Sequence, residues 1–199
     1  IVGKYSGMVQ KALAKLSSAR IGAICPLHGL VWRSDPARVI GLYDRWSRYE
    51  ADDAAVVIYA SMYGNTAQMA DHVARRIAEA GVRDIRVYDV SKTHVSYLIS
   101  EIWRCRGVLL GSCAYNTQMF PLMENLTRDL LHAGPKDRLL GVFGTYSWNG
   151  GGVKNLNAFA EQIGWETVAP SAEILGRPTC EKYAACDALA DAMACRLKK

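Results

Sequence analysis

The residues best suited to chemistry lie in the stretch Ser61-Met62-Tyr63-Gly64-Asn65-Thr66. It follows the apolar run 54–60 and leads into a helical pattern in which Met69, Val73 and Ile77 recur every four residues. A strand, a tight loop and a helix together present backbone N–H groups and a helix N-terminus, which bind anions. Three hydroxyl side chains, one Gly and one Asn suit a loop that wraps around a phosphate group.

The stretch differs from the loops that hold larger nucleotides. It has no Lys and no Gly-Lys-Ser/Thr ending, which a nucleoside-triphosphate loop requires. It also lacks the G-x-G-x-x-G of a dinucleotide loop. A neutral, hydroxyl-lined cradle favours flavin mononucleotide (FMN) as the ligand. The alternative is a polar strand-to-helix turn that caps its helix and binds nothing.

Composition limits the class of protein. A chain of 199 residues, half of them hydrophobic and 22% charged, is typical of one folded domain, or of one domain plus a piece of another. No run of about 18 apolar residues is present, so we expect no membrane span. The chain begins with Ile1 and shows no signal-peptide pattern, which predicts a fragment or a processed chain.

The cysteines and the charges exclude further classes. The six cysteines form no Cys-x-x-Cys pair, which disfavours a zinc ribbon or a rubredoxin-type iron site and predicts a cytoplasmic protein with mostly buried thiols. Residues 1–50 hold eight Lys/Arg and three Asp/Glu, whereas residues 51–199 hold sixteen of each. Without aromatic interleaving or a long basic run, this surplus predicts a solvated face or a domain contact and no nucleic-acid partner.

The leading segment reads as helix, strand, helix. Residues 4–16 have an amphipathic helical pattern, residues 21–25 a short strand, and Asp35-Pro36 a cap and first position of a helix ending near Glu50. The polar residues 51–53 predict a domain boundary. Fifty residues with one short strand cannot bury a core of their own, so we expect this segment to dock on the second domain, on another chain or on a missing part of its own domain.

From residue 54 onward strands and helices alternate. Strands are predicted near 54–60, 84–89, 107–112, 138–144 and 166–170, and helices near 65–80, 94–103, 119–132, 152–163 and 180–197. The third and fourth strands are almost entirely apolar, as in parallel strands covered by helices on both faces. Five such units predict an α/β fold with a doubly wound, five-stranded parallel sheet, whose ligand lies at the carboxyl ends of the strands.

The loops after the third and fourth strands should therefore also bind the ligand. They are Ser112-Cys113-Ala114-Tyr115-Asn116-Thr117 and the run from Gly144 to Gly152. The second loop carries two aromatic residues and three consecutive glycines, which suit a flavin ring that needs flat partners and close backbone N–H groups. The alternative is a surface loop whose Trp packs under the sheet edge. The predicted cofactor-binding residues are Ser61, Met62, Tyr63, Gly64, Asn65, Thr66, Ser112, Cys113, Ala114, Tyr115, Asn116, Thr145, Tyr146, Ser147, Trp148, Asn149, Gly150 and Gly151.

At these three loops the chain resembles a flavodoxin-type domain, and more specifically the C-terminal part of a flavodiiron protein (A-type flavoprotein). The run from Ile24 to Leu30, followed by Tyr43-Asp44-Arg45-Trp46, is similar to the end of that family's metallo-β-lactamase-like domain. The resemblance spans essentially the whole chain. It implies that residues 1–50 are the C-terminal tail of a metallo-β-lactamase-like di-iron domain and that residues 54–199 are a flavodoxin-like, FMN-binding domain.

The resemblance also implies roles for individual residues. The matches are Ser61, Tyr63, Asn65 and Thr66 with the phosphate loop, Tyr115 and Asn116 with the loop beside the ring, Trp148 with the ring-stacking aromatic, and Thr145, Tyr146 and Gly150 with backbone around the isoalloxazine. Two positions depart from the family pattern: Cys113-Ala114 stands where Pro-Thr is expected, and Ser147 stands where Gly is usual.

His28 matches the last histidine ligand of the family's non-haem di-iron centre. The other ligands, a His-x-Glu-x-Asp-His cluster with a later His and Asp, do not occur in this sequence. One histidine cannot hold two irons. We therefore expect most of the di-iron centre to lie outside this chain.

The function implied by the resemblance is that of an enzyme. The chain would be the FMN-bearing electron-transfer portion of an oxidoreductase that reduces dioxygen to water, nitric oxide to nitrous oxide, or both. Its electrons would come from a rubredoxin-like protein or a reduced deazaflavin, and its subunits would pair head-to-tail as a homodimer. Three alternatives remain: a stand-alone flavodoxin-like electron carrier, an FMN-dependent quinone reductase, and a docking domain that has lost its flavin.

Overall fold

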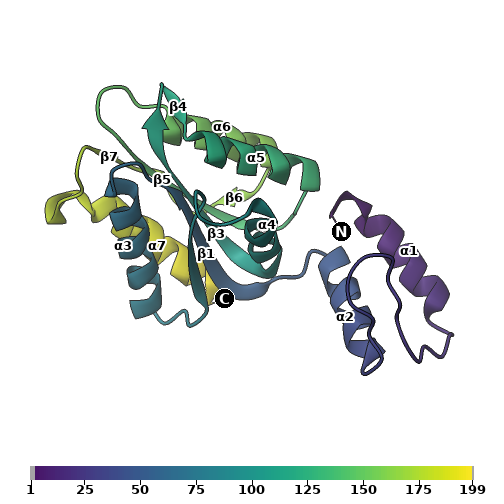
Figure 1. Cartoon of the computed structure of the whole chain (residues 1–199). Helices are drawn as coiled ribbons and strands as arrows, with labels where there is room; N and C mark the ends of the chain where they lie inside the picture. Colours follow the sequence, from purple (N-terminus) through teal and green to yellow (C-terminus); the bar gives the residue numbers. More distant parts are fainter. Residues whose placement is uncertain (1–2, 199) are drawn as a thin grey trace. The chain divides into compact units, whose positions relative to one another are not determined.

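The computed structural model describes residues 3–198 (Figure 1). The chain divides into two compact units, Ile1–Glu50 and Ala51–Lys199. The expected polar joint at 51–53 is wrong in part, because strand β1 (Asp52–Ala60) already begins there. Asp52 is paired with Cys105 in the sheet, and Arg104 and Arg106 form ion pairs with the Asp52 and Asp53 carboxylates at 3.5 and 2.9 Å.

The first unit is built from two helices. A short 3-10 helix (Gly3–Tyr5) leads into α1 (Ser6–Leu16), and α2 (Pro36–Ser47) follows after a long connection. As predicted, Asp35 caps α2: its carboxylate accepts a hydrogen bond from the Arg38 N–H at 3.2 Å. The Gln10 side chain donates from α1 to Asp44 and Ser47 of α2, at 2.9 and 2.7 Å.

The short strand expected at residues 21–25 is wrong. The segment holds one isolated antiparallel bridge, between Ile24 and Trp32. Pro26 has no N–H to donate, and Gly29 turns the chain with a φ of +105°, so the ladder does not extend beyond this pair.

The second unit contains a sheet whose strands are nearly all parallel (Figure 1). After β1, its strands are β2 (Ile85–Asp89), β3 (Cys105–Tyr115), β4 (Gln118–Met119), β5 (Leu139–Tyr146), β6 (Glu166–Thr167) and β7 (Ala172–Leu175). The order is β2-β1-β3-β5-β6, with β7 also parallel to β5 and β4 antiparallel to β3. The predicted α/β class and flavodoxin-like, doubly wound parallel sheet are confirmed, and the strand order reverses between β1 and β3.

The fifth strand position differs from the expectation of one strand at 166–170. β6 pairs with the start of β5, at Leu139 and Leu140, and β7 pairs with its end, from Phe143 to Tyr146. Pro170 lies between the two short strands and cannot donate to the ladder. The edge of the sheet is therefore interrupted where a continuous strand was predicted.

Two helical layers cover the sheet. Helices α3 (Asn65–Glu79) and α7 (Ala184–Leu197) pack on one face, and α4 (Val95–Arg104), α5 (Pro121–Ala133) and α6 (Gly152–Ile163) pack on the other. Alternate residues of β1 serve the two cores: Val57 packs with α3 and α7, and Ile58 with the other layer. The predicted stripe Met69, Val73 and Ile77 is fully buried.

The cysteines do not follow the expectation of mostly buried thiols. All six are free; Cys105, Cys113 and Cys186 are buried, but the remaining three are exposed. The exposed ones lie in the first unit's loop, before α7 and on the outer side of α7, where no strand or helix covers them. In residues 3–198 no helix is both long enough and apolar enough to cross a bilayer.

A buried arginine just before β5 connects this strand to the C-terminal end of α4. Arg138 is 1% exposed, and its guanidinium donates to the carbonyl oxygens of Ile102, Trp103 and Lys136 at 2.6–2.9 Å. Ile102 and Trp103 lie in the last turn of α4, where carbonyls lack helical partners and the macrodipole favours a cation. Burial lowers the pKa of Arg138 to about 10, so the side chain is charged at neutral pH.

We predict that Arg138→Met lowers the free energy of unfolding by about 3 kcal/mol, because it leaves buried carbonyls without donors. Urea titration followed by circular dichroism measures this loss. Arg106→Met is the control: Arg106 forms an exposed ion pair with Asp53, worth about 1 kcal/mol or less. Equal losses in the two variants would contradict a special role for Arg138.

Candidate cofactor site

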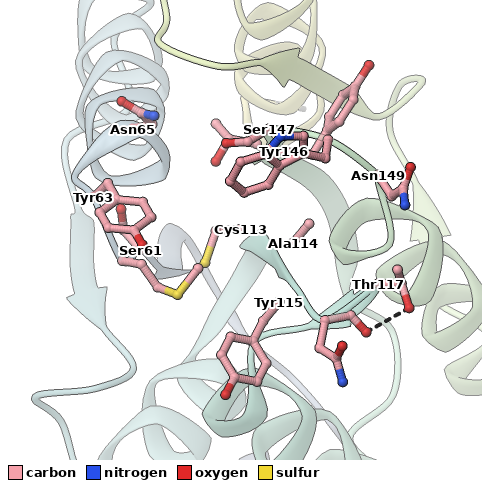
Figure 2. Close-up of a pocket in the computed structure, with 14 residues that line it drawn as sticks. Ser61, Tyr63, Asn65, Cys113, Ala114, Tyr115, Thr117, Tyr146, Ser147 and Asn149 are labelled. Atoms are coloured by element: carbon pink, nitrogen blue, oxygen red, sulfur yellow. Dashed lines mark hydrogen bonds between the residues drawn. The ribbon is translucent and has the colours of Figure 1, made fainter.

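A cleft of about 380 Å³ opens at the carboxyl ends of β1, β3 and β5, within the range of small-molecule sites. Figure 2 shows the side chains around it. The lining residues are Ser61, Met62, Tyr63, Asn65, Cys113, Ala114, Tyr115, Asn116, Thr117, Thr145, Tyr146, Ser147, Trp148 and Asn149. The three predicted loops therefore meet at one site.

The loop after β1 presents an open helix N-terminus to this cleft. Gly64, with a φ of +84°, precedes α3 and offers no side chain as a cap. The first helical hydrogen bond runs from the Gln68 N–H to the Gly64 carbonyl, so the N–H groups of residues 65–67 come before it. The Ser61 hydroxyl accepts a hydrogen bond from the Gly64 N–H at 3.0 Å and holds the turn. No Lys or Arg is among the residues that line the cleft in the described part of the chain.

A hairpin that the sequence analysis missed forms another wall. β3 turns back into β4 through Asn116 and Thr117, whose φ angles are +47° and +60°. Such two-residue turns need positive φ at both positions, and Asn accepts it more readily than Thr. Asn116 could have indicated the turn in the sequence. Thr117 argued against it, because a β-branched residue rarely adopts a positive φ. Thr117 lines the cleft although it was not among the predicted residues.

The glycine loop after β5 packs closely on this hairpin. Gly151 has a φ of +151°, and a Cβ at this position would lie 2.2 Å from the Thr117 carbonyl oxygen. At Gly150 a Cβ would meet only the Glu173 side chain, at 3.4 Å. Asn155 also donates to the Gln118 side chain at 2.8 Å. The hairpin and the glycine loop therefore support each other.

Aromatic side chains stand exposed around the opening. Trp148 is 91% exposed and Tyr63 is 84% exposed. Tyr115 packs edge-to-face on Phe120, with ring centroids 6.0 Å apart. The alternative in which Trp148 packs under the sheet edge is therefore wrong: its ring is free to cover a flat ligand.

Some of the predicted binding residues lie behind the lining of the cleft. Thr66 is fully buried, and its hydroxyl is 2.8 Å from that of Thr145. The buried Ser112 hydroxyl accepts a hydrogen bond from the Phe120 N–H at 2.9 Å and donates to the Cys113 carbonyl. Gly64, Gly150 and Gly151 are likewise absent from the lining. These residues shape the loops that form the walls.

Cys113 is buried in the wall, opposite Thr145 in the β3–β5 register. Burial raises the pKa of its thiol, so the side chain is a neutral thiol at physiological pH. A neutral Cys113 adds no charge to the cleft.

His28, the predicted metal ligand, lies in an exposed turn of the first unit. Among residues 3–198, no group of three or more His, Cys, Asp or Glu is placed to hold a metal ion. Of the other histidines, His72 bonds to Asp187 at 2.7 Å and His94 caps α4. The described residues therefore do not form a metal centre by themselves.

Comparison with known proteins identifies the family to which this domain belongs. The family model for flavodoxin matches residues 57–188, which include every strand end that forms the cleft. The chain belongs to the flavodoxin family. A flavodoxin domain implies FMN as cofactor, and the cleft fits it: an uncapped helix N-terminus suits a phosphate, and the exposed Trp148 suits a flat ring.

Longer relatives match most of the chain. The anaerobic nitric oxide reductase flavorubredoxin of Vibrio vulnificus is 29% identical over 170 residues, covering 84% of this chain and 34% of that protein. The protein of the same name from Pectobacterium carotovorum is 31% identical over 149 residues, covering 74% of this chain and 29% of that protein. The chain thus spans about a third of the length of these relatives.

Solved structures match the whole chain, the first unit included. The rubredoxin oxygen:oxidoreductase of Desulfovibrio gigas matches with a TM-score of 0.91 at 24% identity, covering 100% of this chain and 50% of that one. The flavodiiron protein of Giardia intestinalis matches with a TM-score of 0.89 at 21% identity, covering 100% and 49%. At these identities the likeness shows the fold. Together with the relatives above, it confirms the resemblance to flavodiiron proteins.

We predict that Gly151→Ala weakens flavin binding and lowers the melting temperature, because its Cβ would displace the Thr117 carbonyl from the cleft wall. The expected loss of affinity is about tenfold or more, from a steric cost of about 1–3 kcal/mol. Gly150→Ala is the matched control and should remain close to wild type. Fluorescence titration with FMN and thermal melting give the two readouts; indistinguishable variants would contradict the contact between the loops.

Proposed function

We propose that this chain is the FMN-bearing electron-transfer portion of a flavodiiron oxidoreductase that reduces dioxygen to water, nitric oxide to nitrous oxide, or both. The observation that carries the proposal is the cleft at the ends of β1, β3 and β5, formed by three loops of a flavodoxin-family domain. The names of the relatives support the reaction class, since one group is called nitric oxide reductases and another protein an oxygen:oxidoreductase.

The phosphate end of the site would be the loop from Ser61 to Thr66. The α3 N-terminus offers backbone N–H groups and the positive end of its macrodipole, which compensates for the absence of a cationic side chain in the lining. Ser61 and Tyr63 add hydroxyl groups at the lining itself. This arrangement holds an anion while keeping the cleft free of fixed positive charge.

The ring end would be formed by the loops after β3 and β5. FMN, when bound, supplies transfer of electrons one or two at a time. Trp148 and Tyr115 would cover apolar faces and exclude water, and the backbone from Ser147 to Gly150 would offer N–H groups to the ring edge. The neutral Cys113 thiol would add no charge to this end of the cleft.

Residues 1–50 would be the C-terminal tail of a metallo-β-lactamase-like di-iron domain. Supporting this, the unit exposes large apolar side chains, including Met8, Leu16, Leu27 and Leu30. Exposed apolar groups of this size are typical of a surface that packs against other protein. His28 would be one iron ligand, and the remaining ligands would come from the portion of the longer relatives that this chain does not span.

The electron donor would be a rubredoxin-type protein or a reduced deazaflavin, in the cytoplasm. The names flavorubredoxin and rubredoxin oxygen:oxidoreductase support the first of these. A head-to-tail homodimer would bring the cleft of one subunit to the di-iron centre of the other. Sedimentation equilibrium of the complete gene product tests the dimer, and oxygen and nitric oxide electrodes test the two substrates.

We predict that Trp148→Ala weakens FMN binding by about five- to tenfold, because the loss of a stacking aromatic removes about 1–1.5 kcal/mol. Fluorescence titration of the apoprotein measures the change. Trp148→Phe keeps a flat ring and should keep most of the affinity, whereas Tyr97→Ala, an exposed aromatic on α4 outside the cleft, should have no effect. Unchanged binding in Trp148→Ala would refute the stacking role.

We predict that His28→Ala in the complete gene product lowers the iron content per chain and abolishes oxygen and nitric oxide reduction while leaving the flavin content unchanged. The physical reason is that a ligand is lost in one unit while the flavin site lies in the other. Metal analysis and the flavin absorption near 450 nm are the readouts. His132→Ala, on α5, is the control. A wild-type product that binds no iron would reject the di-iron assignment and leave a flavodoxin-like carrier.

A further inference from the structure

Two buried threonines connect the loop after β1 with the end of β5. Thr66, in the first turn of α3, is 0% exposed, and Thr145, in β5, is 6% exposed. Their hydroxyl oxygens are 2.8 Å apart, which is the distance of a good O–H···O hydrogen bond. Only Thr145 belongs to the lining of the cleft.

The two hydroxyls carry two protons, and their mutual bond uses one of them. Among the described residues, this mutual bond is the side-chain hydrogen bond that either hydroxyl makes. If Thr145 were the donor, the Thr66 proton would be left in the interior without an acceptor, which costs about 1–3 kcal/mol. If Thr66 donates, the remaining proton belongs to Thr145, at the cleft wall. The second arrangement is favoured because Thr145, unlike Thr66, lines the cleft.

Resting on the FMN-binding function above, we propose that the Thr145 hydroxyl donates a hydrogen bond to the phosphate monoester of the ligand and that Thr66 is a positioning residue that orients it. The phosphate is the acceptor because Thr66 lies in the same first turn whose N–H groups open into the cleft. By accepting from Thr66, the Thr145 oxygen becomes a more polarised, stronger donor. Thr66 therefore acts on the ligand through Thr145.

The test compares FMN with riboflavin, which has the same ring and ribityl chain but no phosphate. Dissociation constants are measured by flavin fluorescence for wild type, Thr145→Val, Thr66→Val, the double variant and Thr66→Ser. Thr127→Val is the matched control, because Thr127 is also buried but its hydroxyl bonds to the Glu124 carbonyl and the Met119 sulfur, neither of which lines the cleft. Thermal melting of each apoprotein reports the structural effect of each change separately.

We expect Thr145→Val to weaken FMN binding by about tenfold or more, the size of a lost hydrogen bond to a charged group, and to leave riboflavin within about twofold. Thr66→Val should give a similar selective loss, the double variant should add little to it, and Thr66→Ser should restore FMN affinity. If Thr145→Val does not fold, Thr145→Ser and Thr66→Val decide the same question: the first should keep the preference for FMN and the second should lose it.

Equal weakening of FMN and riboflavin would overturn the phosphate contact. A Thr66→Val variant that lowers the melting temperature without changing FMN affinity would overturn the positioning role, as would fully additive effects of the two substitutions. These outcomes leave the FMN-binding function intact. A wild-type protein that binds neither flavin would instead reject both proposals.

Discussion

The cleft depends on how closely the ends of β3 and β5 approach each other. A Cβ at Gly144 would lie 2.3 Å from the Ser112 carbonyl oxygen, and one at Gly152 would lie 2.9 Å from the same atom. Because both positions are glycine, the two strand ends and the start of α6 pack backbone against backbone. The Ser112 hydroxyl then holds the chain beyond the hairpin through the Phe120 N–H. This close contact therefore positions the loops after β3 and β5 that form the walls of the cleft.

The same packing explains how a neutral cleft can be suited to an anion. With no Lys or Arg among the described lining residues, favourable potential must come from fixed dipoles: the α3 N-terminus and hydroxyls such as Ser61. Fixed dipoles work only where they are held in place. The buried pair Thr66 and Thr145 joins α3 to β5 and keeps this helix end aligned with the cleft.

Much of the second unit could be predicted because its signals are local. The buried stripe at Met69, Val73 and Ile77 marks α3, and the apolar run of β3 marks a strand covered on both faces. The predictions failed where the local structure depends on a contact between two segments that are distant in the sequence. The Asn116-Thr117 turn adopts an unfavourable φ at Thr117 because β4 pairs with β3, and β6 and β7 separate because each meets a different part of β5.

The sequence by itself determined the class of fold, the position of the loops at the strand ends and the absence of Lys and Arg from the phosphate loop. These features follow from residue types and periodicity. Only the tertiary structure decided which loop residues face the cleft and which support it. Thr66 illustrates the division: its position in a phosphate-type loop suggested a ligand contact, but folding places its hydroxyl against Thr145. A hydrogen bond between residues 79 positions apart leaves no mark in local sequence, since it exists only when the parallel register brings α3 and β5 together.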